Sequence, residues 1–332
     1  MWAERVRNGG RCLILNLSLG QNQNGYHGET IDIAAVLRDS VSVAETHSWE
    51  IHWLETENSL RILTLHRASS TAHRKIYLSA GIHGDEPAAP LAMLRLLREN
   101  DWPSDAELWI CPCLNPSGFP RNTRENAAGD DLNRDYKSPH TPEIRAHVAW
   151  LETLPDFDFS IQLHEDWEAK GFYCYELKMD GTPTEPRRVL EAVEAICPID
   201  HSPEIDGRKN DHGLIRPELN PAERELWPEA FWLVMNKTRL SYTCEAPSDF
   251  EMEVRVEALV AAMQTAGLPT VYSDSIGTLL WSKMAYNCAL NPLSALLDVP
   301  YGGLAEAAET RAMMEAVIRE LYAVGDAVGV VL

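Results

Sequence analysis

The chain has 332 residues, 45% of them hydrophobic, so it is long enough for one large domain or two ordinary ones. Its 29 Lys and Arg are outnumbered by 50 Asp and Glu, which gives a formal net charge of −21 at pH 7. Such a surface repels phosphate backbones and anionic lipids, so we expect no nucleic acid and no membrane among its partners. No stretch approaches the ~20 apolar residues of a membrane span.

Seven cysteines are scattered along the chain, and none forms a Cys-x-x-Cys pair. This pattern indicates neither a disulfide framework nor a cysteine-ligated metal, so we expect a reducing, cytoplasmic location. The apolar run Cys12–Leu19 is short, is interrupted by Asn16, and has no clear cleavage site after it. We therefore predict no signal peptide and treat residues 1–25 as an N-terminal extension.

Predicted helices and strands alternate up to about residue 267. Helical spacing covers Ile31–Leu37, a proline opens a helix over Pro87–Leu97, and Glu251–Gly267 has an amphipathic helical pattern. Strands are predicted at Leu60–Leu65, Lys75–Ala80, Glu107–Cys111, Phe157–Leu163 and Leu240–Cys244. This alternation is typical of an α/β fold.

Polar residues follow several of these strands directly. His83 and Glu86 lie just beyond Lys75–Ala80, His164 follows Leu163, and Glu245 follows Cys244. Open α/β sheets bind ligands beyond the carboxyl ends of their strands. We therefore expect these side chains to converge on one crevice.

His83, Glu86 and His164 together offer two imidazole nitrogens and one carboxylate. That is the ligand set of a catalytic zinc ion, which leaves a fourth position for a water molecule able to attack an amide at neutral pH. A single His-x-x-Glu carries little information, and each histidine could be an ordinary loop residue. Such ligands also accept other divalent ions, so the sequence leaves the identity of the metal open.

The surrounding motifs occur in a fixed order and are specific as a set. They are His83-x-x-Glu86, Asn115-Pro-Ser-Gly118, Thr123-Arg124-x-Asn126, Asp131-Leu-Asn133-Arg134, His164 and Thr243-x-Glu245. Over about residues 26–267 the chain resembles the zinc carboxypeptidase family, closest to bacterial members similar to murein peptide amidase. The resemblance implies a three-layer α/β fold with a central mixed sheet, one Zn²⁺ ion, and hydrolysis of a peptide or peptide-like amide adjacent to a terminal carboxylate.

The resemblance also implies which residues hold the metal. His83, Glu86 and His164 match the zinc ligands of the family. Asp131 matches the carboxylate that orients a ligand histidine. On the sequence alone, Asp131 could also be a capping residue before a turn.

Four further residues match positions that act on the substrate. Arg124 matches the arginine that stabilises the developing oxyanion, and Glu245 matches the general base and acid. Asn133 and Arg134 match the pair that grips the terminal carboxylate of the substrate. Because a nearby cation lowers the pKa of a carboxyl group, Glu245 would need partial burial to be a useful base.

Two features depart from the pancreatic type of the family. No tyrosine lies between His201 and Leu240, so the phenol that closes over the substrate in those enzymes has no counterpart there. Trp227, Phe231 or Trp232 could shield the site instead, or could belong to the core.

Other charged residues near the motifs have two interpretations each. Glu165 and Asp166 could support a second metal ion or only form hydrogen bonds. The segment Ile205–Gly213 is expected at the pocket rim, where Arg208 either selects acidic groups or is a solvated loop charge.

Succinylglutamate desuccinylase and aspartoacylase form the second candidate family. They share the His-x-x-Glu motif and the later histidine, and they would make the chain an N-acyl amino acid amidohydrolase. We therefore expect either a small peptide or an acyl-amino-acid substrate.

The C-terminal segment has a different character. After a linker at Gly267–Thr270, residues 271–332 are Ala-rich and helical in pattern. Trp281-Ser-Lys283, Asn287 and Asn291-Pro292 resemble the start of the ketopantoate reductase C-terminal domain, in which the matching lysine is the general acid and the asparagines bind substrate.

No Gly-x-Gly-x-x-Gly motif occurs in the chain, so nothing would hold the nicotinamide cofactor, and this disfavours the alternative of an NADPH-dependent ketopantoate reductase. We interpret residues 271–332 as a partial domain joined by a fusion. Its apolar faces should pack on the first domain, self-associate or remain loosely ordered, and of these we expect weak packing on the first domain. They include Leu279, Leu280, Met284 and Leu290.

Overall fold

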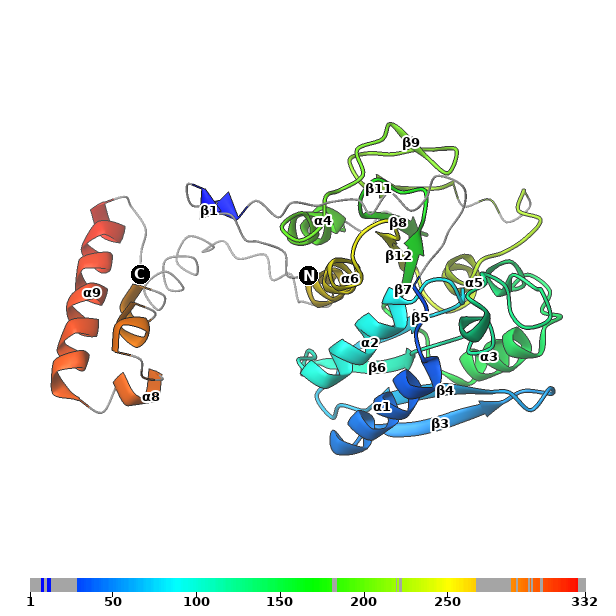
Figure 1. The fold of residues 1–332 in the computed structure, drawn as a ribbon, viewed down its shortest axis with the longest axis horizontal. Coiled ribbons are helices and arrows are strands. Elements are labelled where there is room, and N and C mark those ends of the chain that lie inside the picture. The colour runs from blue at the N-terminus through cyan, green and yellow to red at the C-terminus, as the bar shows by residue number, and fades with distance from the viewer. Residues whose placement is uncertain are drawn as a thin grey trace. The chain divides into compact units, whose positions relative to one another are not determined.

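The computed structural model describes residues 7–8, 11–12, 29–180, 184–218, 220, 223–266, 288–290, 292–297, 299, 301–304 and 307–327. The chain divides into two compact units, Met1–Leu268 and Pro269–Leu332 (Figure 1). The predicted linker and the reductase-like residues Trp281, Lys283, Asn287 and Asn291 lie outside the described residues, as do Leu279, Leu280 and Met284.

An eight-stranded sheet forms the centre of the first unit, in the order β11-β8-β12-β7-β5-β6-β4-β3 (Figure 1). Its inner strands β12, β7, β5 and β6 run parallel, whereas β8 pairs antiparallel with β12, and β4 with both β3 and β6. The predicted mixed sheet is therefore confirmed. The strands are β3 (Glu50–Glu55), β4 (Arg61–Arg67), β5 (Arg74–Ala80), β6 (Ala106–Cys111), β7 (Phe159–Asp166), β8 (Tyr173–Lys178), β11 (Leu214–Ile215) and β12 (Leu240–Pro247).

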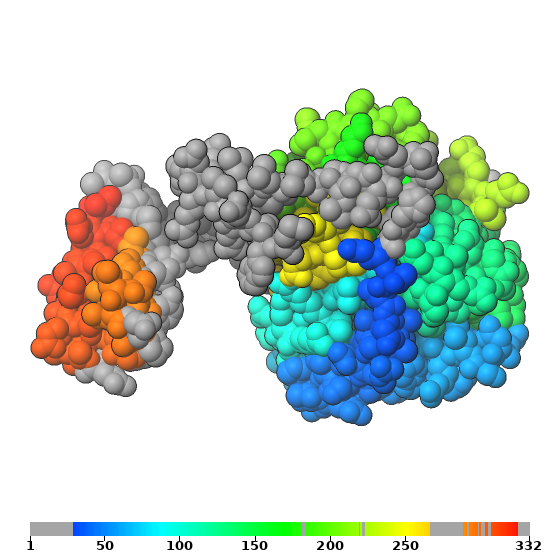
Figure 2. Space-filling model, in the orientation of Figure 1, coloured from blue at the N-terminus to red at the C-terminus, as the bar shows by residue number. Residues whose placement is uncertain are grey.

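Helices cover both faces of this sheet, which gives the three-layer fold implied by the sequence. One core cluster joins the sheet to α1 (Ile33–Thr46), α2 (Ala88–Glu99), α4 (Pro186–Glu194) and α6 (Met252–Ala266). Apolar side chains of α3 (Pro142–Thr153) and α5 (Glu229–Asn236) pack on the opposite face. Figure 2 shows α1, α2 and α6 side by side, coloured blue, cyan and yellow.

The remaining elements are short. Strands β1 (Arg7–Asn8) and β2 (Arg11–Cys12) pair with each other, as do β9 (Glu204–Ile205) and β10 (Arg208–Lys209). Single 3₁₀ turns occur at η1 (Phe119–Arg121) and η2 (Leu132–Arg134). In the second unit, residues 288–290 and 292–297 are helical, followed by α8 (Tyr301–Leu304) and α9 (Ala308–Ala327), so its described part is helical as predicted. None of the helices described is long and apolar enough to cross a membrane.

A buried chain of hydrogen bonds connects α3, β5 and α5 on the face of the sheet that these two helices cover. The Tyr136 hydroxyl lies 2.8 Å from His147 Nδ1, and His147 Nε2 lies 2.8 Å from the Tyr77 hydroxyl. Tyr77 donates to Glu229 Oε1 at 2.9 Å, and Ser79 donates to Glu229 Oε2 at 2.9 Å. Since Tyr77 gives its proton to Glu229, His147 donates from Nε2 and accepts at Nδ1. The chain of donors ends on one buried carboxyl group.

Burial raises the pKa of Glu229 to about 7, although the hydroxyl groups of Ser79 and Tyr77 oppose the shift. Because the folded pKa lies above the ordinary value, its protonated form stabilises the fold at low pH. That contribution is lost as the pH rises from about 4.5 through 7.

We expect Glu229→Gln to remove this pH dependence. From pH 5 to 8, wild-type protein should lose at most about 3 kcal/mol of unfolding free energy relative to the variant. Urea unfolding of both proteins across that range measures the difference. Chelator-treated samples are used, since a bound cation would itself lower the pKa of Glu229. Parallel curves for the two proteins would contradict the assignment.

Candidate active site

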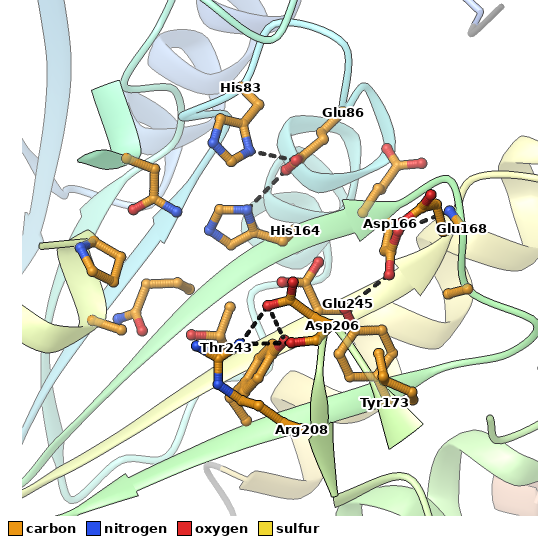
Figure 3. Close-up of a pocket in the computed structure, with 18 of the residues that line it drawn as sticks. His83, Glu86, His164, Asp166, Glu168, Tyr173, Asp206, Arg208, Thr243 and Glu245 are labelled. Atoms are coloured by element: carbon orange, nitrogen blue, oxygen red, sulfur yellow. Dashed lines mark hydrogen bonds and ion pairs between the residues drawn. The ribbon is translucent and has the colours of Figure 1, made fainter. Parts of the chain in front are cut away.

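The register of three parallel strands places the predicted site residues at one edge of the sheet. His83 and Glu86 lie on the loop between β5 and α2, and His164 lies on β7. Glu245 on β12 is the direct cross-strand partner of His164. Figure 3 shows Glu86 beside both histidines, with Glu245 in the same pocket. The expected convergence of strand ends is confirmed.

Close backbone packing fixes the loop that carries two of the predicted ligands. A Cβ atom on Gly84 would overlap the backbone of Gly118, so only glycine fits there. Asn115 holds the opposing turn, because its Oδ1 accepts the Gly118 N–H at 2.9 Å. The Asn-Pro-Ser-Gly motif therefore forms the surface against which the His83–Glu86 loop packs.

Glu165 anchors the end of the same loop. Its Oε1 accepts the backbone N–H of Ala88 at the start of α2, and its Oε2 accepts from the Arg255 guanidinium at 2.6 Å. Both side chains are fully buried. These contacts favour the hydrogen-bonding interpretation of Glu165 over that of a ligand to a second metal.

His83, Glu86 and His164 are brought together as a buried group. One ligand atom from each lies within 4.8 Å of the others. Both Nδ1 atoms face the Glu86 carboxylate, and that of His164 lies 2.9 Å from Glu86 Oε2. Burial alone would raise the pKa of Glu86, but the two imidazoles hold it well below its usual range. Two nitrogens and an ionised carboxylate fit a divalent cation.

The contacts of Asp131 fit both of the interpretations that the sequence left open. Its Oδ1 accepts the Asn133 N–H at 2.9 Å, which caps η2, and lies 3.4 Å from Nε2 of His83. That buried nitrogen has no hydrogen bond within the described part of the chain. Burial opposes ionisation of Asp131, yet His83 and Arg124 hold its pKa well below the usual range. A negative Asp131 can therefore orient the imidazole.

The Arg124 side chain lies beside the group formed by His83, Glu86 and His164. Its Nε donates to Asp131 Oδ2 at 2.9 Å, and its NH1 lies 3.8 Å from Glu86 Oε1. The side chain is part-buried and lines the cavity, so it remains available to a ligand. This position suits a donor to a developing oxyanion.

Glu245 is held partly buried beside the metal-ligand group. Burial raises its pKa to about 8, against the opposing charges of His164 and Arg124. The requirement stated from the sequence, that burial must offset nearby cations, is met. A carboxyl group that titrates near neutral pH can accept and return a proton.

Asn133 and Arg134 lie side by side on η2 and line the same cavity. The Asn133 Oδ1 accepts the backbone N–H of Glu229 at 2.9 Å, which leaves its Nδ2 as the group free to meet a ligand. Arg134 is exposed and makes no ion pair with any residue that the structure describes. Both can therefore donate to an incoming carboxylate.

The cavity around these residues has a volume of about 900 Å³. Two tyrosines of β8 line it, and neither was predicted from the sequence. Tyr173, the cross-strand neighbour of Glu245, donates to Asp166 Oδ2 at 2.9 Å. Tyr175 lies two residues along the same strand and also lines the cavity. The only signal in the sequence was that the two tyrosines are two residues apart, which is the spacing of side chains on one face of a strand.

The three aromatic residues considered as a shield do not line this cavity. Phe231 and Trp232 are buried in the core, and Trp227 packs edge-on against Phe231. The core interpretation therefore holds for them.

Comparisons with known proteins agree with the two-part sequence. Residues 72–198 match the profile of the succinylglutamate desuccinylase/aspartoacylase catalytic domain, and residues 275–332 match that of the ketopantoate reductase PanE/ApbA C terminal. A 2-dehydropantoate 2-reductase of Aquifex aeolicus is 41% identical over 78 residues, and carboxypeptidase SOL1 of Arabidopsis thaliana is 33% identical over 107. These matches cover 24% and 25% of this chain, and 25% and 21% of the two relatives. The chain thus spans about a quarter of the length of the curated relatives it matches.

Solved structures share the fold of the first unit. A protein from Shewanella amazonensis that is assigned as a metallopeptidase superposes with a TM-score of 0.62 at 22% identity, covering 70% of this chain and 91% of that one. A metallo-carboxypeptidase from Burkholderia cenocepacia gives 0.54 at 19% identity, covering 70% and 67%. The fold is that of the metallocarboxypeptidases. The resemblance seen in the sequence, a carboxypeptidase-like part followed by a reductase-like fragment, is confirmed.

We expect Gly84→Ala to weaken metal binding, because the added methyl group must push the ligand loop away from Gly118. A loss of tenfold or more in affinity, about the size seen when groups supporting a metal ligand are removed, is expected in a competition titration with a chromophoric chelator.

Gly129→Ala is the matched control. It also places alanine at a glycine, with a positive φ of 93°, but its Cβ meets nothing within 4 Å. It should cost stability without changing metal affinity. Equal affinities for the Gly84 variant and wild type would show that the loop is not fixed by this contact.

Proposed function

We propose that the first unit is a metal-dependent hydrolase, with one Zn²⁺ ion as its cofactor, that cleaves a peptide or peptide-like amide adjacent to a terminal carboxylate. The observation that carries the proposal is the buried group of His83, Glu86 and His164 beside Glu245 and Arg124. A metal-ligand group, a proton carrier and an oxyanion donor in one cavity are the parts that amide hydrolysis requires.

A bound divalent cation would supply Lewis-acid chemistry, by lowering the pKa of a water molecule and polarising the scissile carbonyl. His83, Glu86 and His164 would hold that cation, and Asp131 would keep the His83 ring in place. The Zn²⁺ assignment rests on the mixed nitrogen and carboxylate donor set.

The remaining steps belong to side chains of the chain. Glu245 accepts a proton from the attacking water and returns it to the leaving amine, so the proton is conserved over the cycle. Arg124 donates to the carbonyl oxygen as negative charge develops there. Asn133 and Arg134 fix the terminal carboxylate, which places the amide between these groups.

An N-acyl amino acid amidohydrolase is the second candidate. The match of residues 72–198 to the desuccinylase and aspartoacylase profile favours it. It requires the same ligands and the same base, so the two candidates differ in the acyl side of the substrate. A panel of dipeptides and N-acetyl or N-succinyl amino acids separates them.

We expect removal of the metal with a chelator to abolish turnover on the best substrate of that panel, and added Zn²⁺ to restore it. Glu245→Gln should lower kcat by about 10²–10⁴-fold while the metal content stays equal to that of wild type, because Glu245 moves a proton and is not a ligand. Glu191→Gln, on the exposed side of α4, is the control and should leave kcat unchanged. Full activity of Glu245→Gln would reject the mechanism.

The second unit should be dispensable for this activity, because every residue that lines the cavity precedes residue 249. A chain ending at residue 268 should keep the metal content and the kcat of the full chain. Loss of both would show that the second unit supports the first.

We also propose that the second unit mediates self-association. Several apolar side chains of its helices are exposed, namely Leu296, Leu297, Met313, Tyr322 and Val324. Sedimentation of the full chain should then depend on concentration, whereas that of the shortened chain should not.

A further inference from the structure

The strands of the central sheet present their cavity-lining side chains in rows across the sheet. His164 on β7, Glu245 on β12 and Tyr173 on β8 form the row at the reacting end, as cross-strand partners. Gln162 and Thr243, which are also partners of each other, lie two residues earlier on β7 and β12. Two residues of a strand span ~6.6 Å, so this second row lies deeper in the cavity. Figure 3 shows Thr243 in the same pocket as His164 and Glu245.

The Gln162 amide is oriented by two buried hydroxyl groups. Ser160 Oγ donates to Ser241 Oγ at 2.9 Å, and Ser241 Oγ donates to Gln162 Oε1 at 2.8 Å. Because Ser241 accepts from Ser160, its own hydrogen goes to Gln162, and the amide atom that it contacts is therefore the oxygen. The nitrogen of the same amide is left as a donor.

This donor is buried without a partner. Gln162 is only 1% exposed, and its Nε2 forms no hydrogen bond with any residue that the structure describes. A buried N–H group without an acceptor destabilises the free protein. Because Gln162 lines the cavity, an entering ligand or water molecule can supply the acceptor. The amide therefore indicates a hydrogen-bond acceptor at this depth of the cavity.

The neighbours of Gln162 in its row are uncharged. Its cross-strand partners are Ser79 and Thr243. Ser79 gives its hydroxyl hydrogen to Glu229 at 2.9 Å, so it has none left for a ligand. Thr243 lines the cavity, and its hydroxyl group can both donate and accept. The row thus offers one amide N–H and one hydroxyl group.

The surrounding wall supplies apolar contacts rather than positive charge. Leu177 on β8 and Ala230 on α5 belong to one apolar cluster and line the same cavity. In the described part of the chain, the arginines that line the cavity lie on loops, on η2 and on β10, and none lies on the central sheet. Arg208, on β10, pairs with Asp206. A carboxylate bound beside Gln162 would lose water without gaining a cation from these strands.

The group proposed to bind the terminal carboxylate of the substrate is linked to this row. Asn133 Oδ1 accepts the backbone N–H of Glu229, and the Glu229 carboxyl group accepts from Ser79. Ser79 is in turn the cross-strand partner of Gln162. A leaving residue whose α-carboxylate meets Asn133 therefore has the Gln162 row within reach of its side chain.

We infer that the leaving residue of the substrate carries a neutral side-chain carboxamide, as glutamine does, whose oxygen accepts from Gln162 Nε2 and whose NH₂ group donates to Thr243 Oγ1. The inference rests on the proposed function, since it assigns the part of the cavity beyond the reacting amide. A carboxamide has both an acceptor and a donor, which matches one amide N–H and one hydroxyl group. An apolar side chain would leave the buried N–H unpaired. Gln162 and Thr243 are thus assigned to specificity.

Binding of free amino acids tests the inference without requiring turnover. Glutamine, glutamate and methionine have side chains of similar length, but only that of glutamine is both polar and uncharged. In calorimetric titrations of the Zn²⁺-loaded full chain, glutamine should bind at least about tenfold more tightly than either of the others. Equal affinities for glutamine and methionine would overturn the inference, and so would tighter binding of glutamate.

Turnover gives the second readout. Dipeptides and N-acetyl amino acids that release glutamine should have a kcat/KM at least about tenfold above those that release glutamate or methionine. Hydrolysis without this preference would overturn the inference and leave the proposed function standing. Tight glutamine binding without any hydrolysis would reject the proposed function and support the assignment of Gln162 and Thr243.

Two variants test the assigned residues. Gln162→Met keeps the length of the side chain and removes the donor, so the ratio of kcat/KM for glutamine release over methionine release should fall at least about tenfold. Thr243→Val keeps the shape of the side chain and should lower the same ratio by a smaller factor. Both variants should keep the Zn²⁺ content of wild type, which shows that they are folded. An unchanged ratio in Gln162→Met would show that water, and not substrate, pairs with this donor.

Gln264→Met is the matched control. Gln264 is exposed on α6, donates to Glu99 at 2.9 Å and does not line the cavity. The substitution is the same, but it removes an amide that lies away from the site. This variant should keep the ratio of wild type.

Discussion

The Glu86 carboxylate, buried between two imidazoles, is the constraint around which the rest of the site is arranged. Removing an ionised carboxylate from water costs several kcal/mol unless positive charge compensates it. The rings of His83 and His164 both face that carboxylate in the structure, and a bound divalent cation would supply the positive charge. Asp131 and Arg124 lie next to this group and form an ion pair with each other. Asp131 also faces the His83 ring.

The two layers of helices support this centre in different ways. On one face, Glu165 and Arg255 fix the start of α2 and with it the ligand loop. On the other face, Glu229 ends a buried hydrogen-bond chain and its backbone N–H orients Asn133. The proposed metal ligands are thus held from one side of the sheet, and the amide proposed to bind substrate is held from the other.

The chain combines this unit with a fragment of another kind of protein. Residues 275–332 match the C-terminal part of ketopantoate reductases, yet the cavity, the metal-ligand group and the proposed base all belong to the first unit. Hydride transfer needs a bound nucleotide, and the chain has no glycine-rich dinucleotide motif. The chemistry proposed for the chain therefore uses the first unit alone.

The sequence by itself determined the inner strands, the helices α1, α2 and α6, and the residues that meet at the sheet edge. Central strands buried on both faces form continuous apolar runs, and each such run ends at a polar motif. The outer strands β3 and β8 and the helices α3, α4 and α5 were missed. Strand β3 is only partly buried and mixes polar and apolar residues, so its sequence resembles a loop.

Tertiary structure alone decided how the cavity is lined. Tyr173 reaches Glu245 only because β8 pairs antiparallel with β12, and Arg224 lines the cavity while its guanidinium stacks on Phe231 of α5. The sequence likewise left two interpretations of Asp131, Glu165 and Arg208 open. Each choice depends on a partner far away along the chain, and a local pattern carries no information about which distant residues will become neighbours.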